Sequence, residues 1–133
     1  MDKLQVELQR VSAEYQKLQQ DLGEVVQSRQ RLESQRQENE GVKEEFDKLK
    51  EGEVIYKLVG PVLLKQERFE AEGTVKGRLD FIGKEIDRVE DQIKDIEKVI
   101  EGKKGEIIQI QAAAQALAQQ QAQQSQQGKQ VEA

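Results

Sequence analysis

The sequence predicts a mainly α protein, a long antiparallel two-helix coiled coil whose helices are joined by a central β-hairpin. Apolar residues recur at alternating spacings of three and four on both sides of the dipeptide Gly60-Pro61. Around that dipeptide the pattern changes to short stretches rich in β-branched residues. Charged residues make up 35% of the 133 residues and aromatic residues 4%. This balance suits solvated helices in one elongated domain better than a thick globular core.

The first helix is expected over about residues 2–50. Asp2 is a suitable N-terminal cap, Lys48 and Lys50 would suit the negative end of the helix dipole, and Gly52 is a typical stop signal. The apolar residues that form the expected seam are Leu4, Leu8, Val11, Tyr15, Leu18, Leu22, Val25, Leu32, Val42 and Phe46.

The hairpin is expected over about residues 53–66, with its turn at Gly60-Pro61. Both faces of this hairpin are apolar, and an isolated two-stranded hairpin is marginally stable at best. We therefore expect other chains to cover it, the alternative being that it lies against the base of its own helices. The residues expected to make the assembly contacts are Val54, Ile55, Tyr56, Leu58, Val59, Val62, Leu63 and Leu64.

The second helix is expected over about residues 70–118. When the chain is folded at Gly60-Pro61, its seam falls opposite the first, so that Val11 faces Ile110 and Phe46 faces Val75; this predicts antiparallel packing. Residues 119–133 are rich in Gln and lack a seam, and we expect them to be disordered. The second seam comprises Val75, Leu79, Ile82, Ile86, Val89, Ile93, Ile96, Ile100, Ile107, Ile110, Ala114 and Leu117.

Four polar residues interrupt the seams: Arg29, Arg36 and Asn39 in the first helix and Lys103 in the second. Polar seam residues lower stability but fix register, and long side chains can cover an apolar partner while their charges reach water. One interpretation is a coiled coil whose central segment is less stable and bends or separates. The other, which we favour, is the ordinary variation of a solvated coiled coil.

Composition and motifs indicate no enzyme. The chain has no His and no Cys, so the commonest general base, a thiolate nucleophile, a disulfide and the usual zinc ligands are missing. The segment Gly102–Gly105 lacks the spacing of a phosphate-binding loop, and we expect no cofactor or metal. The net charge of −5 argues against nucleic acid, and no apolar run predicts a membrane span or signal segment. A cytoplasmic protein is the expectation.

The free end of the coiled coil is a candidate binding surface. Apolar residues occur there off the seam as well as on it, and exposed apolar surface often marks an interaction site. The alternative is that the alanines nearby serve only helix propensity. The residues of this expected apolar tip are Leu4, Val6, Leu8, Ile107, Ile108 and Leu117.

Two segments resemble the β-type subunits of the prefoldin family, and within it the subunit 6 members. Residues 54–66 are similar to the strand-turn-strand of those proteins, and residues 74–82 are similar to the start of their second helix. Small departures are the order Lys76-Gly77 and Phe81 in place of the usual Tyr. The Gln-rich end is typical of a eukaryotic member.

The resemblance implies a function in protein folding. It implies a hetero-hexamer in which two α-type and three further β-type subunits join this one through a β-barrel of hairpins. The tips of the coiled coils would hold unfolded actin and tubulin and pass them to the cytosolic chaperonin without ATP. The alternative function is that of a structural coiled coil whose hairpin mediates dimerisation.

Overall fold

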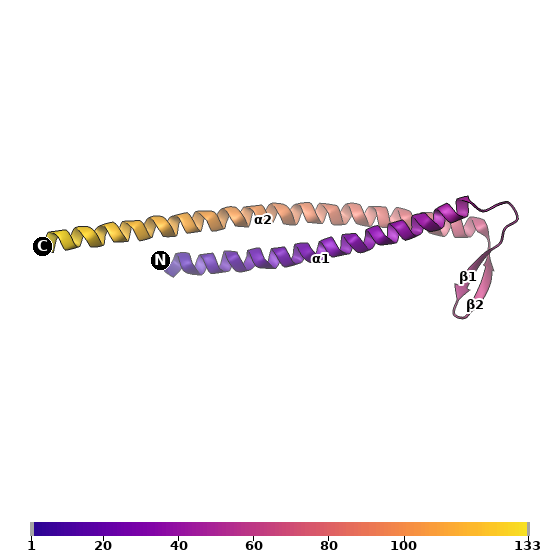
Figure 1. Ribbon diagram of the computed structural model, residues 1–133, viewed down its shortest axis with the longest axis horizontal. Helices are drawn as coiled ribbons and strands as arrows, with labels where there is room; N and C mark the ends of the chain where they lie inside the picture. The colour runs from indigo at the N-terminus through magenta and orange to yellow at the C-terminus, as the bar shows by residue number, and fades with distance from the viewer. Residues whose placement is uncertain (1, 133) are drawn as a thin grey trace. The chain divides into compact units, whose positions relative to one another are not determined.

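The computed structural model describes residues 2–132, with side chains described for residues 2–128 (Figure 1). Helix α1 (Asp2–Asp47) is followed by strands β1 (Ile55–Val59) and β2 (Val62–Gln66) and by helix α2 (Arg68–Glu132). The predicted fold, two long helices with an antiparallel hairpin between them, is confirmed. The chain divides into two compact parts. The hairpin part is Val25–Gln92, and the terminal part joins α1 up to Glu24 with α2 from Ile93.

The terminal part is held by a narrow seam. Val11 and Ile110, which the sequence places opposite each other, are both buried there, as is Ile100. Lys103 Nζ lies 2.7 Å from Glu14 Oε2, so this ion pair joins α2 to α1. The seam residues explain why these two helical segments pair, because each helix has only one apolar stripe to bury.

The core of the hairpin part lies on one face of α2. The buried residues recur at spacings of three, four and seven, which places them on one side of a helix with 3.6 residues per turn. Phe46 of α1 is half-buried at the same end of this part. The buried residues of this face are Ala71, Val75, Ile82, Ile86 and Val89.

Helix α1 ends at Asp47, slightly before the predicted end near residue 50. Lys48 and Lys50 therefore lie just beyond the helix, although the amide of Lys48 still donates to the carbonyl of Glu44 over 3.1 Å. The expected interaction of their charges with the helix dipole stays a prediction. The chain turns at Gly52, whose φ is 91°, and the amide of Glu53 donates to the carbonyl of Lys50 over 3.2 Å. A positive φ at the third residue of such a turn favours glycine.

Helix α2 begins at Arg68, two residues before the expected start, and continues to Glu132. The structure thus differs from the disorder expected after residue 118. Alanine and glutamine are both good helix formers, and no proline follows Pro61 to interrupt the helix. The described side chains from Ala118 to Gly128 are all exposed. Intrinsic propensity rather than packing therefore accounts for this extension.

Candidate functional site

The hairpin closes through a tight two-residue turn. Val59 pairs with Val62, so Gly60 and Pro61 form the loop. Gly60 has a φ of 58°, and the proline ring holds its own φ near about −65°. This combination is that of a type II′ turn, whose twist matches the twist of the two strands. The turn fixes the register and therefore decides which side chains share a face.

The register gives the hairpin two apolar faces, as the sequence predicts. Leu58 pairs with Leu63 and shares a face with Tyr56, whereas the pair Val59 and Val62 lies on the opposite face. Leu58 is 69% exposed. Every residue of the predicted assembly set except Ile55 is exposed. The exposed members are Val54, Tyr56, Leu58, Val59, Val62, Leu63 and Leu64.

Only the base of the hairpin lies near the helices of its own part. Half-buried Ile55 lines a hollow of about 320 Å³ together with Phe46 of α1 and Val75 of α2. The strands beyond this base keep their side chains in solvent. The alternative that the hairpin lies against its own helices thus applies to its base, where Tyr56 also lines the hollow, and not to the rest of the hairpin surface.

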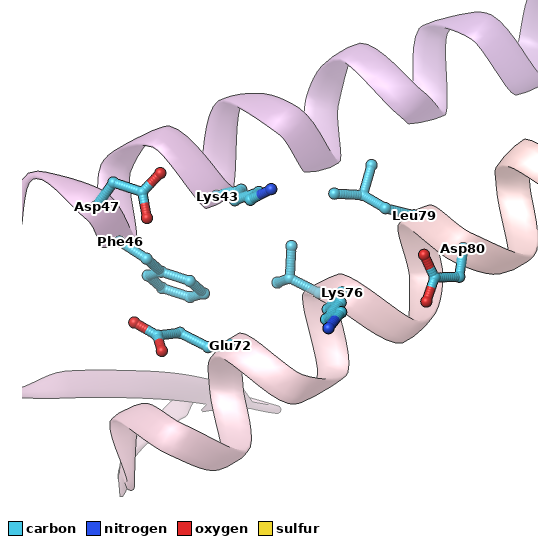
Figure 2. Close-up of a pocket in the computed structure, with 8 residues that line it drawn as sticks. Lys43, Phe46, Asp47, Glu72, Lys76, Leu79 and Asp80 are labelled. Carbon is cyan, nitrogen blue, oxygen red and sulfur yellow. The ribbon is translucent and has the colours of Figure 1, made fainter.

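A second hollow of about 410 Å³ lies between α1 and α2 near the hairpin (Figure 2). Its apolar lining comes from Phe46, Val75 and Leu79, and Figure 2 shows the Phe46 ring turned toward α2. The charged residues at its rim include both signs, so the rim has no single electrostatic preference. Such a hollow suits an apolar side chain and offers no catalytic grouping. The charged lining residues are Lys43, Asp47, Glu72, Lys76 and Asp80.

Arg68 ties the two ends of the hairpin segment together. Its Nη2 donates to the carbonyl of Phe46 over 3.0 Å, and its Nη1 donates to the carbonyl of Leu49 over 3.4 Å. Its Nε donates to Glu72 over 2.8 Å. The Phe46 carbonyl, which also accepts from the amide of Leu49 over 3.1 Å, thus gains a second donor. The guanidinium also places a cation at the negative end of the α1 dipole. Sequence reasoning missed this role, because the contact spans 22 residues.

Sequence reasoning also missed two exposed aromatic residues on α2. Phe69 is 82% exposed and Phe81 is 64% exposed. Both lie in the hairpin part and outside the seam. Their positions in the sequence could have predicted this exposure, because a phenylalanine outside the apolar stripe of an amphipathic helix is expected to face solvent. These rings add to the apolar surface that the hairpin exposes.

The predicted tip residues fall into two groups in the terminal part. Val6 and Ile108 are exposed, at 67% and 65%. Successive residues of a helix are rotated by about 100°, which places each of these side chains well outside the seam of its own helix. The two side chains therefore point in different directions. The six residues therefore do not form a single patch. The half-buried members along the seam are Leu4, Leu8, Ile107 and Leu117.

The polar seam residues behave differently from one another. Lys103 and Arg29 reach across, to Glu14 over 2.7 Å and to Glu90 over 2.7 Å. The hydrogen bond from Lys103 holds the pKa of Glu14 below its ordinary value, and the same bond raises the pKa of Lys103. Arg36 and Asn39 bond instead within α1, to Glu33 and to the carbonyl of Gln35. Two of the four polar residues thus link the helices.

The described residues carry neither a cluster of possible metal ligands nor a helix able to span a membrane. Among the side chains described, those of residues 2–128, no group of three or more carboxylate, His or Cys side chains could hold a metal ion. Among residues 2–132, neither helix carries an apolar stretch of the length and purity needed to span a bilayer.

Comparison with known proteins identifies the family. The family described as prefoldin subunit matches residues 9–114. The chain belongs to the prefoldin subunit family. Prefoldin subunit 6 of Mus musculus is 45% identical over 108 residues, which cover 81% of this chain and 85% of the mouse protein. Prefoldin subunit 6 of Saccharomyces cerevisiae is 45% identical over 104 residues, covering 78% and 91% of the two chains.

The resemblance extends to plants and to solved prefoldin structures. Prefoldin subunit 6 of Arabidopsis thaliana is 35% identical over 114 residues, covering 86% of this chain and 88% of the plant protein. The crystal structure of the prefoldin beta subunit from Thermococcus strain KS-1 superposes with a TM-score of 0.72 at 24% identity. It covers 80% of this chain and 91% of that one. The predicted resemblance to prefoldin, and to subunit 6 in particular, is confirmed.

Proposed function

We propose that this chain is a β-type subunit of a cytoplasmic prefoldin hexamer that captures unfolded polypeptides without ATP and delivers them to the cytosolic chaperonin. Two α-type and three further β-type subunits would complete the hexamer, and its clients would include actin and tubulin. The observation that carries the proposal is the hairpin, apolar and exposed on both faces, in a chain of the prefoldin family. Such a hairpin gains stability when hairpins of other subunits continue its sheet into a β-barrel.

The client-binding part of the proposal rests on the terminal part of the chain. Val6 and Ile108 present isolated apolar side chains on separate faces. Single contacts of this kind are weak, but several subunits acting together can hold a chain of no fixed shape through avidity. Capture at several tips therefore fits the separation of these residues.

The assembly proposal is tested with the double variant Leu58→Lys and Leu63→Glu. These two residues pair across the strands, so the opposite charges preserve the hairpin while removing its apolar face. Lys57→Gln on the same strand is the matched control. Native mass spectrometry of the complex from the protein's own cells should show the control in a hexamer and the double variant outside it. A hexamer containing the double variant would contradict the proposal.

The client proposal is tested with Val6→Ser and Ile108→Ser in the assembled hexamer. Aggregation of unfolded actin, followed by light scattering, should be suppressed less well than by the unmodified complex. Val99→Ser, another exposed position of the terminal part, should leave suppression unchanged. Equal suppression by both complexes would remove these residues from the client surface and leave the assembly proposal standing.

A further inference from the structure

The hairpin is joined to its two helices in unequal ways. On one side, Glu67 alone separates the end of β2 from the start of α2, and its carbonyl accepts a helical hydrogen bond from the amide of Ala71 over 3.1 Å. The direction of α2 therefore follows closely from that of β2. On the other side, residues 48–54 lie between α1 and β1 and include Gly52 with its positive φ. A longer connection leaves more relative directions open to the elements that it joins.

The side chain of Arg68 bridges this less constrained side. Its hydrogen bonds reach the carbonyls of Phe46 and Leu49 at the end of α1. The bond from its Nε to Glu72, over 2.8 Å, orients the guanidinium from within α2. A planar guanidinium donates in fixed directions, so these bonds restrict orientation as well as distance. They hold the end of α1 against the residue at which α2 begins.

Arg68 also acts on the base of the hairpin through Phe46. The carbonyl that it binds belongs to the residue that lines a hollow together with half-buried Ile55 and with Val75. Ile55 is the first residue of β1. A shift of the end of α1 would move Phe46 away from this hollow and uncover the base of the strand. One side chain therefore holds the end of α1, the base of β1 and the start of α2 together.

We infer that Arg68 is a positioning residue for subunit assembly, which sets the direction of the hairpin relative to the helices before a neighbouring subunit binds. The inference rests on the proposed assembly through the hairpin. A strand that joins an intersubunit sheet must meet its neighbour in one register and one direction. A hairpin already held in that direction loses less conformational freedom on binding. The effect of Arg68 thus passes through the hairpin, whose exposed apolar residues make the contact.

The test replaces Arg68 with methionine, which keeps an unbranched side chain and a similar helix propensity but donates no hydrogen bond. Full-length Arg68→Met, co-expressed with a differently tagged unmodified subunit, should lose its share of the hexamer by roughly tenfold in native mass spectrometry. Circular dichroism of the isolated variant should show the same helix content and a melting temperature lower by no more than a few degrees, because the replaced side chain is partly exposed.

A dose experiment separates a shifted binding equilibrium from a damaged fold. A hairpin that samples several directions still reaches the correct one, so expressing the variant in roughly tenfold excess should restore its share of the hexamer. Exclusion that persists at this excess, or a loss of helix that accompanies it, would overturn the inference, because the fold and not the direction of the hairpin would then be at fault.

Two further variants isolate the hydrogen bonds of Arg68. Arg88 bonds to Glu85 within α2, so Arg88→Met is the matched control and should enter the hexamer like the unmodified chain. Arg68→Lys keeps a cation near the end of α1 but cannot reproduce the geometry of the guanidinium. It should remain close to Arg68→Met. Full incorporation of Arg68→Lys would overturn the inference, because a positive charge alone would then suffice.

The remaining outcomes distinguish this inference from the proposed assembly. Arg68→Met that incorporates as well as Arg88→Met would overturn the inference. If Leu58→Lys with Leu63→Glu is excluded in the same experiment, the inference fails alone. If that double variant enters the hexamer, the proposed assembly through the hairpin fails and the inference fails with it.

Discussion

The hairpin part and the terminal part are built from the same two helices but use their apolar residues differently. In the described chain, the exposed large apolar side chains lie in the hairpin part, with three exceptions, Val6, Val99 and Ile108. The terminal part buries Val11 and Ile110 in a narrow seam. The hairpin part thus carries a buried core and, on different residues, an exposed apolar surface. The terminal part has mainly a seam and only scattered exposed contacts.

The largest expected effect comes from the core of the hairpin part. Ile86 is buried, and Ile86→Ala should lower the free energy of unfolding by about 2–5 kcal/mol because it removes buried carbon and leaves a cavity. Urea denaturation followed by circular dichroism measures this change. Exposed Val99→Ala should shift it by less than about 0.5 kcal/mol. Equal losses from the two variants would contradict the division between buried seam and exposed surface.

A smaller effect is expected at the hairpin turn. Gly60 has a positive φ of 58°, which costs a residue with a side chain about 1–2 kcal/mol. Gly60→Ala should therefore disfavour the hairpin while leaving the helices intact. Amide hydrogen exchange should be faster in the strands and unchanged in α2. Equal exchange in the strands of both proteins would show that the turn does not limit hairpin stability. Gly105→Ala, in a helix, is the control.

The smallest effect concerns the ion pair of the terminal part. The pKa of Glu14 lies below its ordinary value of 4.5, so its contribution is present above pH 4.5 and is lost as the pH falls through the folded-state pKa. The pKa of Lys103 lies above 10.5, so its contribution is lost only as the pH rises through that raised value. Glu14→Gln should lower the melting temperature near about pH 7, and the difference should shrink toward about pH 3.

Glu7 provides a matched control for Glu14. Glu7→Gln, at an exposed position of the same helix, should not reproduce the pH dependence. A constant difference between Glu14→Gln and the unmodified chain from neutral to acidic pH would show that the pair does not stabilise the terminal part.

The sequence predicts the fold well because its signals are local or periodic. The seam spacing predicts both helices and their pairing, and Gly60-Pro61 predicts the turn of the hairpin. The same patterns predict apolar residues on both faces of the hairpin, and the register places Leu58 opposite Leu63, where both are exposed. That other chains cover them stays a prediction. Periodicity could not predict Arg68, since its carbonyl partners come from the far side of the hairpin.

The tip illustrates a different limit. Off-seam residues are easy to recognise, yet Val6 and Ile108 lie on outward faces of different helices and not on one surface. A pattern along one helix gives the direction of each side chain but not whether two directions converge. The Gln-rich segment shows the reverse case, because its lack of a seam suggested disorder whereas its composition favours the helix that the structure has.

The hydrogen bonds that join Arg68 to α1 have a mechanical consequence. The guanidinium of Arg68 binds the carbonyl of Phe46 in the last turn of α1 while its own backbone begins α2. A mechanical force applied to the hairpin is therefore transmitted to both helices. It does not separate a single strand from the helix that follows or precedes it. A force exerted on the hairpin by a bound neighbouring subunit would thus be distributed over both helices.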